Sequence, residues 1–153
     1  MGILLTHRHP DIIKRLILVA TFAVSPVRPI PRLIPWSVLF RLPLPRFVAH
    51  YFLIGSNSSQ VDELKRAVQQ TSPRILVQRK HCLMDVDVTR QLSELKCDLL
   101  YLRPKRDRIV SQRSQDQITK ANSSVFICEI DGPHLILQTK PQHVWDCIMD
   151  EGS

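Results

Sequence analysis

Three short apolar runs, far apart in the chain, constrain its fold more than any other feature of the sequence. They span residues 15–22, 97–102 and 124–130. The first run is almost unbroken and contains β-branched residues, which is typical of a strand buried on both faces in a parallel sheet. Segments with helical character separate the runs. This alternation predicts an α/β protein with a parallel sheet.

Helical periodicity or capping residues mark the segments around these runs. The expected helices are residues 1–8, 58–71, a helix starting at Ser72-Pro73, residues 87–95, residues 111–121, and a terminal helix opening at Lys140-Pro141. In the terminal helix, Val144, Trp145 and Ile148 have the spacing of one face and are expected to point inward.

Residues 23–46 differ from the rest, because they contain six prolines among mostly apolar residues. Linkers are usually polar, so a linker is not predicted here. Proline interrupts helices, and we expect short apolar helices that form a lid over an apolar cleft. A membrane-surface segment is the alternative, since arginines flank the apolar residues. We therefore divide the chain into a core, residues 1–22 plus 96–153, and a helical lid insertion, residues 23–95.

Composition restricts the class of protein further. A chain of 153 residues with 44% hydrophobic and 23% charged residues fits one soluble globular domain. No apolar run reaches the ~18 residues that span a bilayer, so stable membrane insertion is not predicted. The formal net charge is +7. The sequence has one basic cluster, residues 103–108, which is interrupted by proline and aspartate and lacks alternating aromatic residues. This pattern favours a generic basic surface over a nucleic-acid partner.

The four cysteines are widely separated and lie in apolar contexts. They are Cys82, Cys97, Cys128 and Cys147. No Cys/His spacing indicates a metal site, and neither a metal nor a cofactor is predicted. We expect reduced, buried thiols in a cytoplasmic protein. A secretory signal formed by Lys14-Arg15 and residues 16–24 is the alternative, but the helical rhythm of the residues before it argues against this reading.

Ionisable residues follow two of the predicted strands. Asp107 lies in the loop after residues 97–102, and His134 lies in an Asp-Gly-Pro turn after residues 124–130. Functional groups gather at the carboxyl ends of parallel strands, and neighbouring strands lie about 5 Å apart. We therefore expect the two side chains to meet. A carboxylate that orients an imidazole forms the acid–base part of a nucleophilic triad.

Three passages resemble the C-terminal half of an α/β-hydrolase, of the serine esterase and lipase type. They read RHPDIIKRLILVATF, LLYLRPKRDRIV and IDGPHLILQTKP. The resemblance implies the last three strands of that family's parallel sheet, with flanking helices and a helical lid insertion. It also implies that Asp107 is the catalytic acid and His134 the catalytic base. The substrate would be a small apolar ester, in keeping with Trp36 and Phe40 in the segment expected to form the lid.

The chain departs from this family at the nucleophile, because no two of its four glycines form a G-x-S-x-G pattern. Ser25 precedes a proline, Ser111 has the position of a helix cap, and Cys128 lies in a strand expected to be buried, so none of them is a good replacement. We expect a truncated chain that is inactive on esters unless an N-terminal half completes it.

Two other functions remain open from the sequence. The chain could be a non-catalytic remnant or partner chain that binds through its lid and its sheet edge. The strand at residues 15–22 would present an unpaired apolar edge, which also predicts self-association. A basic protein that binds membrane surfaces or nucleic acid is the third reading, and it rests on net charge alone.

Overall fold

The structure, a computed structural model, describes residues 1–25, 62–63, 66–67 and 69–150. Nearly all of the predicted lid segment at 23–46 lies outside the described residues, as does much of the helix predicted at 58–71.

The described strands form one parallel sheet in the order β1-β2-β3. Strand β1 is Arg15–Val19, the central strand β2 is Asp98–Pro104, and β3 is Phe126–Ile130. Both neighbours of β2 run parallel to it. The three strands and their parallel arrangement confirm the prediction. Each one lies within, or two residues beyond, its predicted range.

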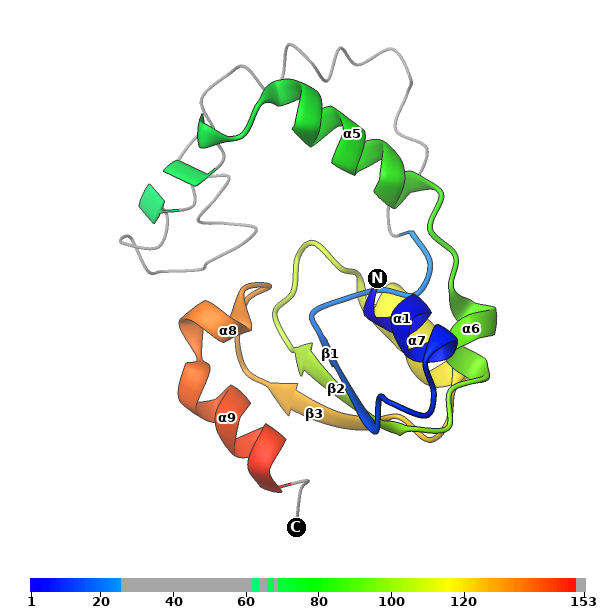
Figure 1. Ribbon diagram of the computed structural model, residues 1–153. Helices are drawn as coiled ribbons and strands as arrows, with labels where there is room; N and C mark the ends of the chain where they lie inside the picture. The colour runs from blue at the N-terminus through cyan, green and yellow to red at the C-terminus, as the bar shows by residue number, and fades with distance from the viewer. Residues whose placement is uncertain (26–61, 64–65, 68, 151–153) are drawn as a thin grey trace.

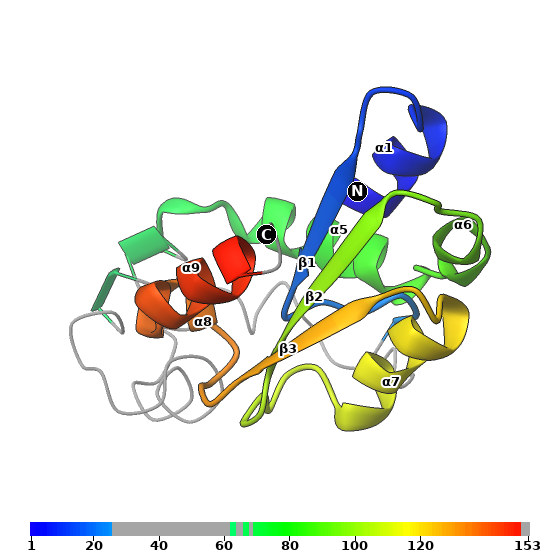
Figure 2. The same ribbon diagram turned by 90° about the horizontal axis from the view of Figure 1, so that it is seen from below.

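Helices cover the two faces of the sheet (Figures 1 and 2). On one face lie α1 (Gly2–Arg8), α6 (Thr89–Ser93) and α7 (Gln112–Ala121), and on the other lie α8 (Ile136–Thr139) and α9 (Pro141–Asp150). Side chains of β2 alternate between the two cores, with Leu99 and Tyr101 in the first and Leu100 and Leu102 in the second. This alternation explains why residues 99–102 of β2 are apolar without a break.

Strand β1 ends three residues earlier than the sequence predicts. Ala20 has a φ of 44°, in the left-handed region that non-glycine residues rarely adopt, and this turn takes the chain out of the sheet. The amide of Ala20 still donates to the carbonyl of Leu102, over 3.1 Å. Apolar residues thus continue past the end of the strand.

The start of the predicted lid insertion meets the segment before α6 (Thr89–Ser93). Val24 and Asp87 form an antiparallel bridge, and the amide of Ser25 donates to the carbonyl of Val86 over 2.8 Å. After this bridge, α6 packs with α1 and α7, and its Leu92 is fully buried. The division at residues 23 and 95 stays a prediction, although α6 clearly contributes to the core.

The remaining helices begin close to the predicted positions. Helix α5 (Pro73–Met84) has a proline in its first turn, and Ser111 caps α7, its side chain accepting from the amide of Ser114. One prediction for α9 is wrong: Val144 is buried, but Trp145 is 58% exposed. Trp145 lies at the border of the apolar face of α9, where helical spacing does not decide burial.

The predicted state of the cysteines is also wrong in part. Cys128 of β3 and Cys147 of α9 form a disulfide with a Cα–Cα distance of 6.3 Å, and Cys82 is exposed. The two half-cystines are 19 residues apart, and only the packing of α9 against β3 brings them together. Reduced thiols therefore no longer support a cytoplasmic location, which stays a prediction. Within the described ranges, no helix is both long and apolar enough to cross a membrane.

Candidate active site

The loop after β2 buries the carboxylate of Asp107. One oxygen, Oδ1, accepts hydrogen bonds from the amides of Ile109 (2.8 Å) and Val110 (2.9 Å). The side chain of Asp107 is 1% exposed. This turn, in which an aspartate accepts from amides two and three residues ahead, is a common use of the side chain in loops. It leaves Oδ2 directed away from its own loop.

The turn after β3 brings His134 to that second oxygen. Nδ1 of His134 lies 2.9 Å from Oδ2 of Asp107. A carboxylate oxygen accepts, so Nδ1 carries the proton and Nε2 of the neutral ring is free to take one. The histidine side chain is 20% exposed, compared with 1% for the aspartate. The structure thus brings together the two side chains that the sequence predicts to meet.

Gly132 allows the histidine turn to pack closely. A Cβ at this position would lie 3.0 Å from Cγ2 of Ile136 at the start of α8, and Ile136 is itself fully buried. A Cβ here would require the side chain of Ile136 to shift by a few tenths of an ångström. The glycine of the Asp-Gly-Pro sequence thus suits this close approach.

Three contacts join the acid loop to the histidine turn. The amide of Lys105 donates to the carbonyl of Ile130 (2.9 Å), and the amide of Arg106 donates to that of Gly132 (3.1 Å). Nε of Arg106 also lies 2.8 Å from Oδ1 of Asp131. Both side chains of this ion pair are well exposed, so its contribution to stability is about 0–1 kcal/mol. The backbone bonds extend the sheet pairing to the base of both loops.

The predicted basic cluster at residues 103–108 is largely occupied by ion pairs. Arg103 lies 3.4 Å from Asp116 and 3.6 Å from Glu129, and Lys105 lies 3.7 Å from Glu129. These pairs neutralise much of the local positive charge. They add support to the interpretation of this cluster as an ordinary surface, and the absence of a nucleic-acid partner stays a prediction.

Tyr101 lies in the core beneath the acid loop. Burial raises the pKa of its hydroxyl, and the negative charge of Asp107 raises this pKa further. The hydroxyl thus keeps its proton and donates a hydrogen bond to the carbonyl of Thr21, 3.1 Å away. Tyr101 is fully buried. It links the exit of β1 to the central strand without acting as an acid near neutral pH.

The structure describes all three residues that the sequence offers as replacement nucleophiles. Ser111 is occupied as the cap of α7, and Cys128 lies in the disulfide. Ser25 lies at the base of the predicted lid, where its amide bonds Val86. Across the described part of the chain, no hydrogen bond to Nε2 of His134 is found, and no cluster of His, Cys, Asp or Glu is suited to a metal.

Solved structures with similar folds are numerous, although no protein-family model and no curated protein sequence matches the chain. The enol-lactonase from Burkholderia xenovorans LB400 has a TM-score of 0.77 at 16% identity, over 97% of this chain and 60% of its own. A thermophilic esterase has a TM-score of 0.69 at 19% sequence identity, over 97% of this chain and 58% of the esterase. The 2-hydroxy-6-oxo-6-phenylhexa-2,4-dienoate hydrolase from Rhodococcus sp. strain RHA1 has a TM-score of 0.70 at 17% sequence identity, over 97% of this chain and 58% of that hydrolase.

The fold is that of an α/β-hydrolase. It matches the C-terminal part of that fold, as the resemblance in the sequence implies. The chain spans about 60% of the length of these structures. In an α/β-hydrolase the acid precedes the histidine along the chain, and Asp107 and His134 follow this order. Their catalytic role goes beyond what a shared fold shows.

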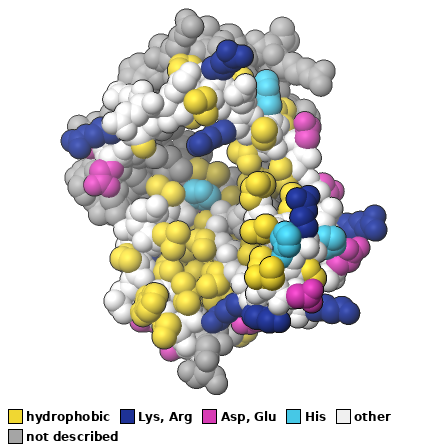
Figure 3. Space-filling model, in the orientation of Figure 1, with side chains coloured by type: hydrophobic (Ala, Val, Ile, Leu, Met, Phe, Trp, Pro, Cys, Tyr) yellow, Lys and Arg dark blue, Asp and Glu magenta, His cyan; other side chains and the backbone are white. Residues whose placement is uncertain are grey.

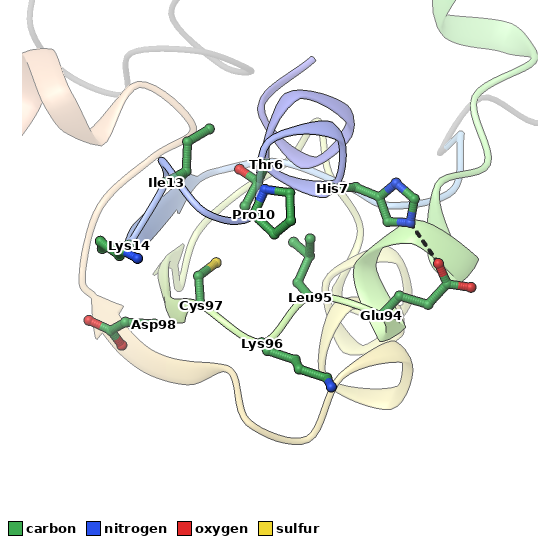
Figure 4. A pocket seen from close by; sticks show the side chains of 10 residues that line it. All are labelled: Thr6, His7, Pro10, Ile13, Lys14, Glu94, Leu95, Lys96, Cys97 and Asp98. Atoms are coloured by element: carbon green, nitrogen blue, oxygen red, sulfur yellow. Dashed lines mark hydrogen bonds and ion pairs between the residues drawn. The ribbon is translucent and has the colours of Figure 1, made fainter.

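A cavity of about 560 Å³ lies at the opposite edge of this α/β-hydrolase sheet (Figure 4). It is bordered by α1, the turn after it, α6 and the start of β2, and Nε2 of His7 lies 2.6 Å from Oε2 of Glu94 at one side. The hydrogen bond from His7, with a further one from Arg90, lowers the pKa of Glu94. The cavity faces the amino ends of β1 and β2, whereas the Asp–His pair lies beyond the carboxyl ends of β2 and β3. It is therefore separate from the candidate active site.

Proposed function

We propose that this chain supplies the acid and the base of a carboxylic ester hydrolase. The observation that carries the proposal is the 2.9 Å contact between Nδ1 of His134 and the buried carboxylate of Asp107. It lies at the edge of the sheet where α/β folds place their chemistry. The esterase and lactonase among the similar structures agree with this class of reaction.

The proposed mechanism uses a serine hydroxyl as the nucleophile. Nε2 of His134 takes the serine proton as the oxygen attacks the ester carbonyl, and it then gives this proton to the departing alkoxide. A water molecule attacks the resulting acyl-serine in the same way, and the acid product leaves. Asp107 keeps the proton of the ring on Nδ1 and stabilises the imidazolium that forms twice in each cycle.

The serine must come from a polypeptide segment other than those in this sequence, which has no G-x-S-x-G pattern. Without a nucleophile and its oxyanion hole, a triad retains little of its rate. We therefore propose that residues 1–153 do not turn over esters alone. An N-terminal half that bears the nucleophile would complete the site, and apolar esters are the proposed substrates.

The test measures p-nitrophenyl acetate hydrolysis by the purified chain, alone and coexpressed with a polypeptide that supplies the N-terminal, G-x-S-x-G-bearing half of an α/β-hydrolase. We expect the chain alone to match buffer, and the combination to show turnover that His134→Ala abolishes. His143→Ala, an exposed histidine on α9, is the matched control and should keep this turnover. Turnover by the isolated chain that disappears in His134→Ala would contradict the need for a second polypeptide. Full turnover by the combined His134→Ala variant would contradict the role of the histidine.

A second proposed function is binding through the sheet edge. Strand β1 pairs with β2 on one side, and no described strand pairs with it on the other. Unpaired backbone groups on an apolar strand favour the addition of another strand. Self-association through this edge would compete with the N-terminal half for the same surface.

A further inference from the structure

Gln115 is a buried polar residue of α7 that the proposed mechanism does not use. It lies in the first turn of the helix, where its amide donates to the carbonyl of Ser111, the capping residue. The residue is 2% exposed. Buried glutamines are uncommon, so the contacts of its side chain need an explanation.

The side chain turns back toward the acid loop. Nε2 of Gln115 donates to the carbonyl of Val110, 3.2 Å away, and this bond is buried. The amide of the same residue, Val110, donates to Oδ1 of Asp107 over 2.9 Å. Both backbone groups of Val110 are thus fixed, one by the helix and one by the acid. Its own side chain is 1% exposed and holds the loop in the core.

The side-chain oxygen of Gln115, Oε1, is not stabilised at this position. Oε1 is buried and has no hydrogen-bond partner in the described ranges. An unpaired buried acceptor is destabilising, and an apolar side chain of similar length would avoid it. Packing alone therefore does not account for a glutamine here. The hydrogen bond from Nε2 to the acid loop does.

We propose that Gln115 is a positioning residue for the acid–base pair. It holds the carbonyl of Val110, which fixes the amide that binds Asp107, and Asp107 in turn orients the ring of His134. This inference rests on the proposed function of the pair. It adds that α7 controls the placement of the pair through one side-chain amide.

The test uses Gln115→Met, which keeps the length of the side chain and removes both polar atoms. Gln112→Met is the matched control, because Gln112 lies on the same helix and its amide bonds only the exposed Asp116. The readout is the proton on Nδ1 of His134, observed by NMR in the ¹⁵N-labelled chain and assigned with His134→Ala. A proton shared with a buried carboxylate resonates downfield of the backbone amides and exchanges slowly.

We expect this resonance in the wild-type chain and in Gln112→Met, and its loss in Asp107→Asn. In Gln115→Met it should broaden or disappear while the thermal unfolding midpoint stays close to that of Gln112→Met. An unchanged resonance in Gln115→Met, with loss in Asp107→Asn, would overturn the role of Gln115 and leave the pair intact. If the resonance is absent from the wild-type chain, the hydrogen bond between Asp107 and His134 is contradicted, and with it the proposed acid–base pair.

A second substitution at the same position checks that the effect does not come from misfolding of Gln115→Met. Gln115→Leu is another apolar side chain with good helix propensity, and it has no atom that can donate to the carbonyl of Val110. It should also lose the resonance. In the completed hydrolase, we expect Gln115→Met to lower kcat by roughly tenfold to a hundredfold with a much smaller change in KM, as displaced catalytic groups do. A change in KM alone would contradict a positioning role.

Discussion

Asp107 combines three hydrogen bonds on one carboxylate, two from its own loop and one from His134. The loop bonds fix the side chain before any substrate arrives, so the imidazole meets an acceptor that is already oriented. A buried, fully bonded carboxylate is also what stabilises a developing imidazolium. The proposed chemistry would therefore depend on main-chain amides of the acid loop as well as on two side chains.

The thiols offer a test of burial at the residue scale. Burial raises the pKa of Cys97, whereas Cys82 is exposed. With a thiol reagent at pH 8 and no reductant, we expect fast labelling of Cys82 and slow labelling of Cys97 that accelerates as the pH rises, because the thiolate reacts. Cys128 and Cys147 should react only after reduction. Mass spectrometry of the labelled peptides measures each rate, and equal rates for the two free thiols would contradict the burial of Cys97.

The raised pKa of Cys97 also makes the stability of the folded chain depend on pH. The pKa of Cys97 is higher in the folded chain than in the unfolded chain. Its contribution to stability is therefore complete below the unfolded pKa and is lost as the pH rises through the folded pKa. The free energy of unfolding should decline in this alkaline range, and less so in Cys97→Ala.

Prediction from sequence succeeded for the positions of residues that follow an element in the chain. Asp107 and His134 lie in the loops after two apolar strands, and that order is enough to expect them to meet, as they do. Gln115 gave no comparable signal, because its role depends on a backbone carbonyl five residues earlier that only the folded loop brings within reach. The disulfide was missed for a similar reason, since its two cysteines come together through tertiary packing.

At the scale of elements, the short helix α6 depends on a residue outside itself. Nδ2 of Asn122, at the end of α7, donates to the carbonyls of Leu92 (2.9 Å) and Leu95 (3.1 Å), and its Oδ1 accepts from the amide of Ser124. A five-residue helix has few bonds of its own. These contacts satisfy carbonyls at its C-terminal end and tie α6 to α7.

We expect Asn122→Ala to lower the free energy of unfolding by about 1–3 kcal/mol, because it removes the side-chain donor to the buried carbonyl of Leu95 and one of the donors to the carbonyl of Leu92. Urea denaturation followed by circular dichroism measures the change. Gln142→Ala is the control, since its amide bonds only the exposed Asp146, and it should change the free energy by less than about 0.5 kcal/mol. Equal effects of the two substitutions would show that Asn122 does not support α6.

At the scale of the whole molecule, the described sheet has an uncovered margin. Hydrophobic side chains gather beside α9 on the face shown in Figure 3, and Trp145 and Met149 of that helix are 58% and 53% exposed. Ile17 and Val19 of β1 are only partly buried at the margin of the same core. An apolar face next to a strand edge that no described strand pairs favours association.

We expect the purified chain to associate as its concentration rises, in sedimentation velocity experiments. Ile17→Lys places a charge on β1 and should shift the chain toward monomer. Leu137→Lys makes the same replacement at an exposed site on α8, away from β1, and should associate like the wild type. A chain that stays monomeric at all concentrations, or equal effects of the two variants, would contradict association through this edge.

The most direct test of the proposed acid–base pair is a double-mutant cycle on kcat for p-nitrophenyl acetate, measured in the chain completed by a polypeptide that carries the proposed nucleophile. If Asp107 acts through His134, Asp107→Asn lowers kcat by on the order of 10⁴-fold, and adding it to His134→Ala has little further effect. Additive losses, or a kcat that Asp107→Asn leaves unchanged, would contradict an acid–base pair.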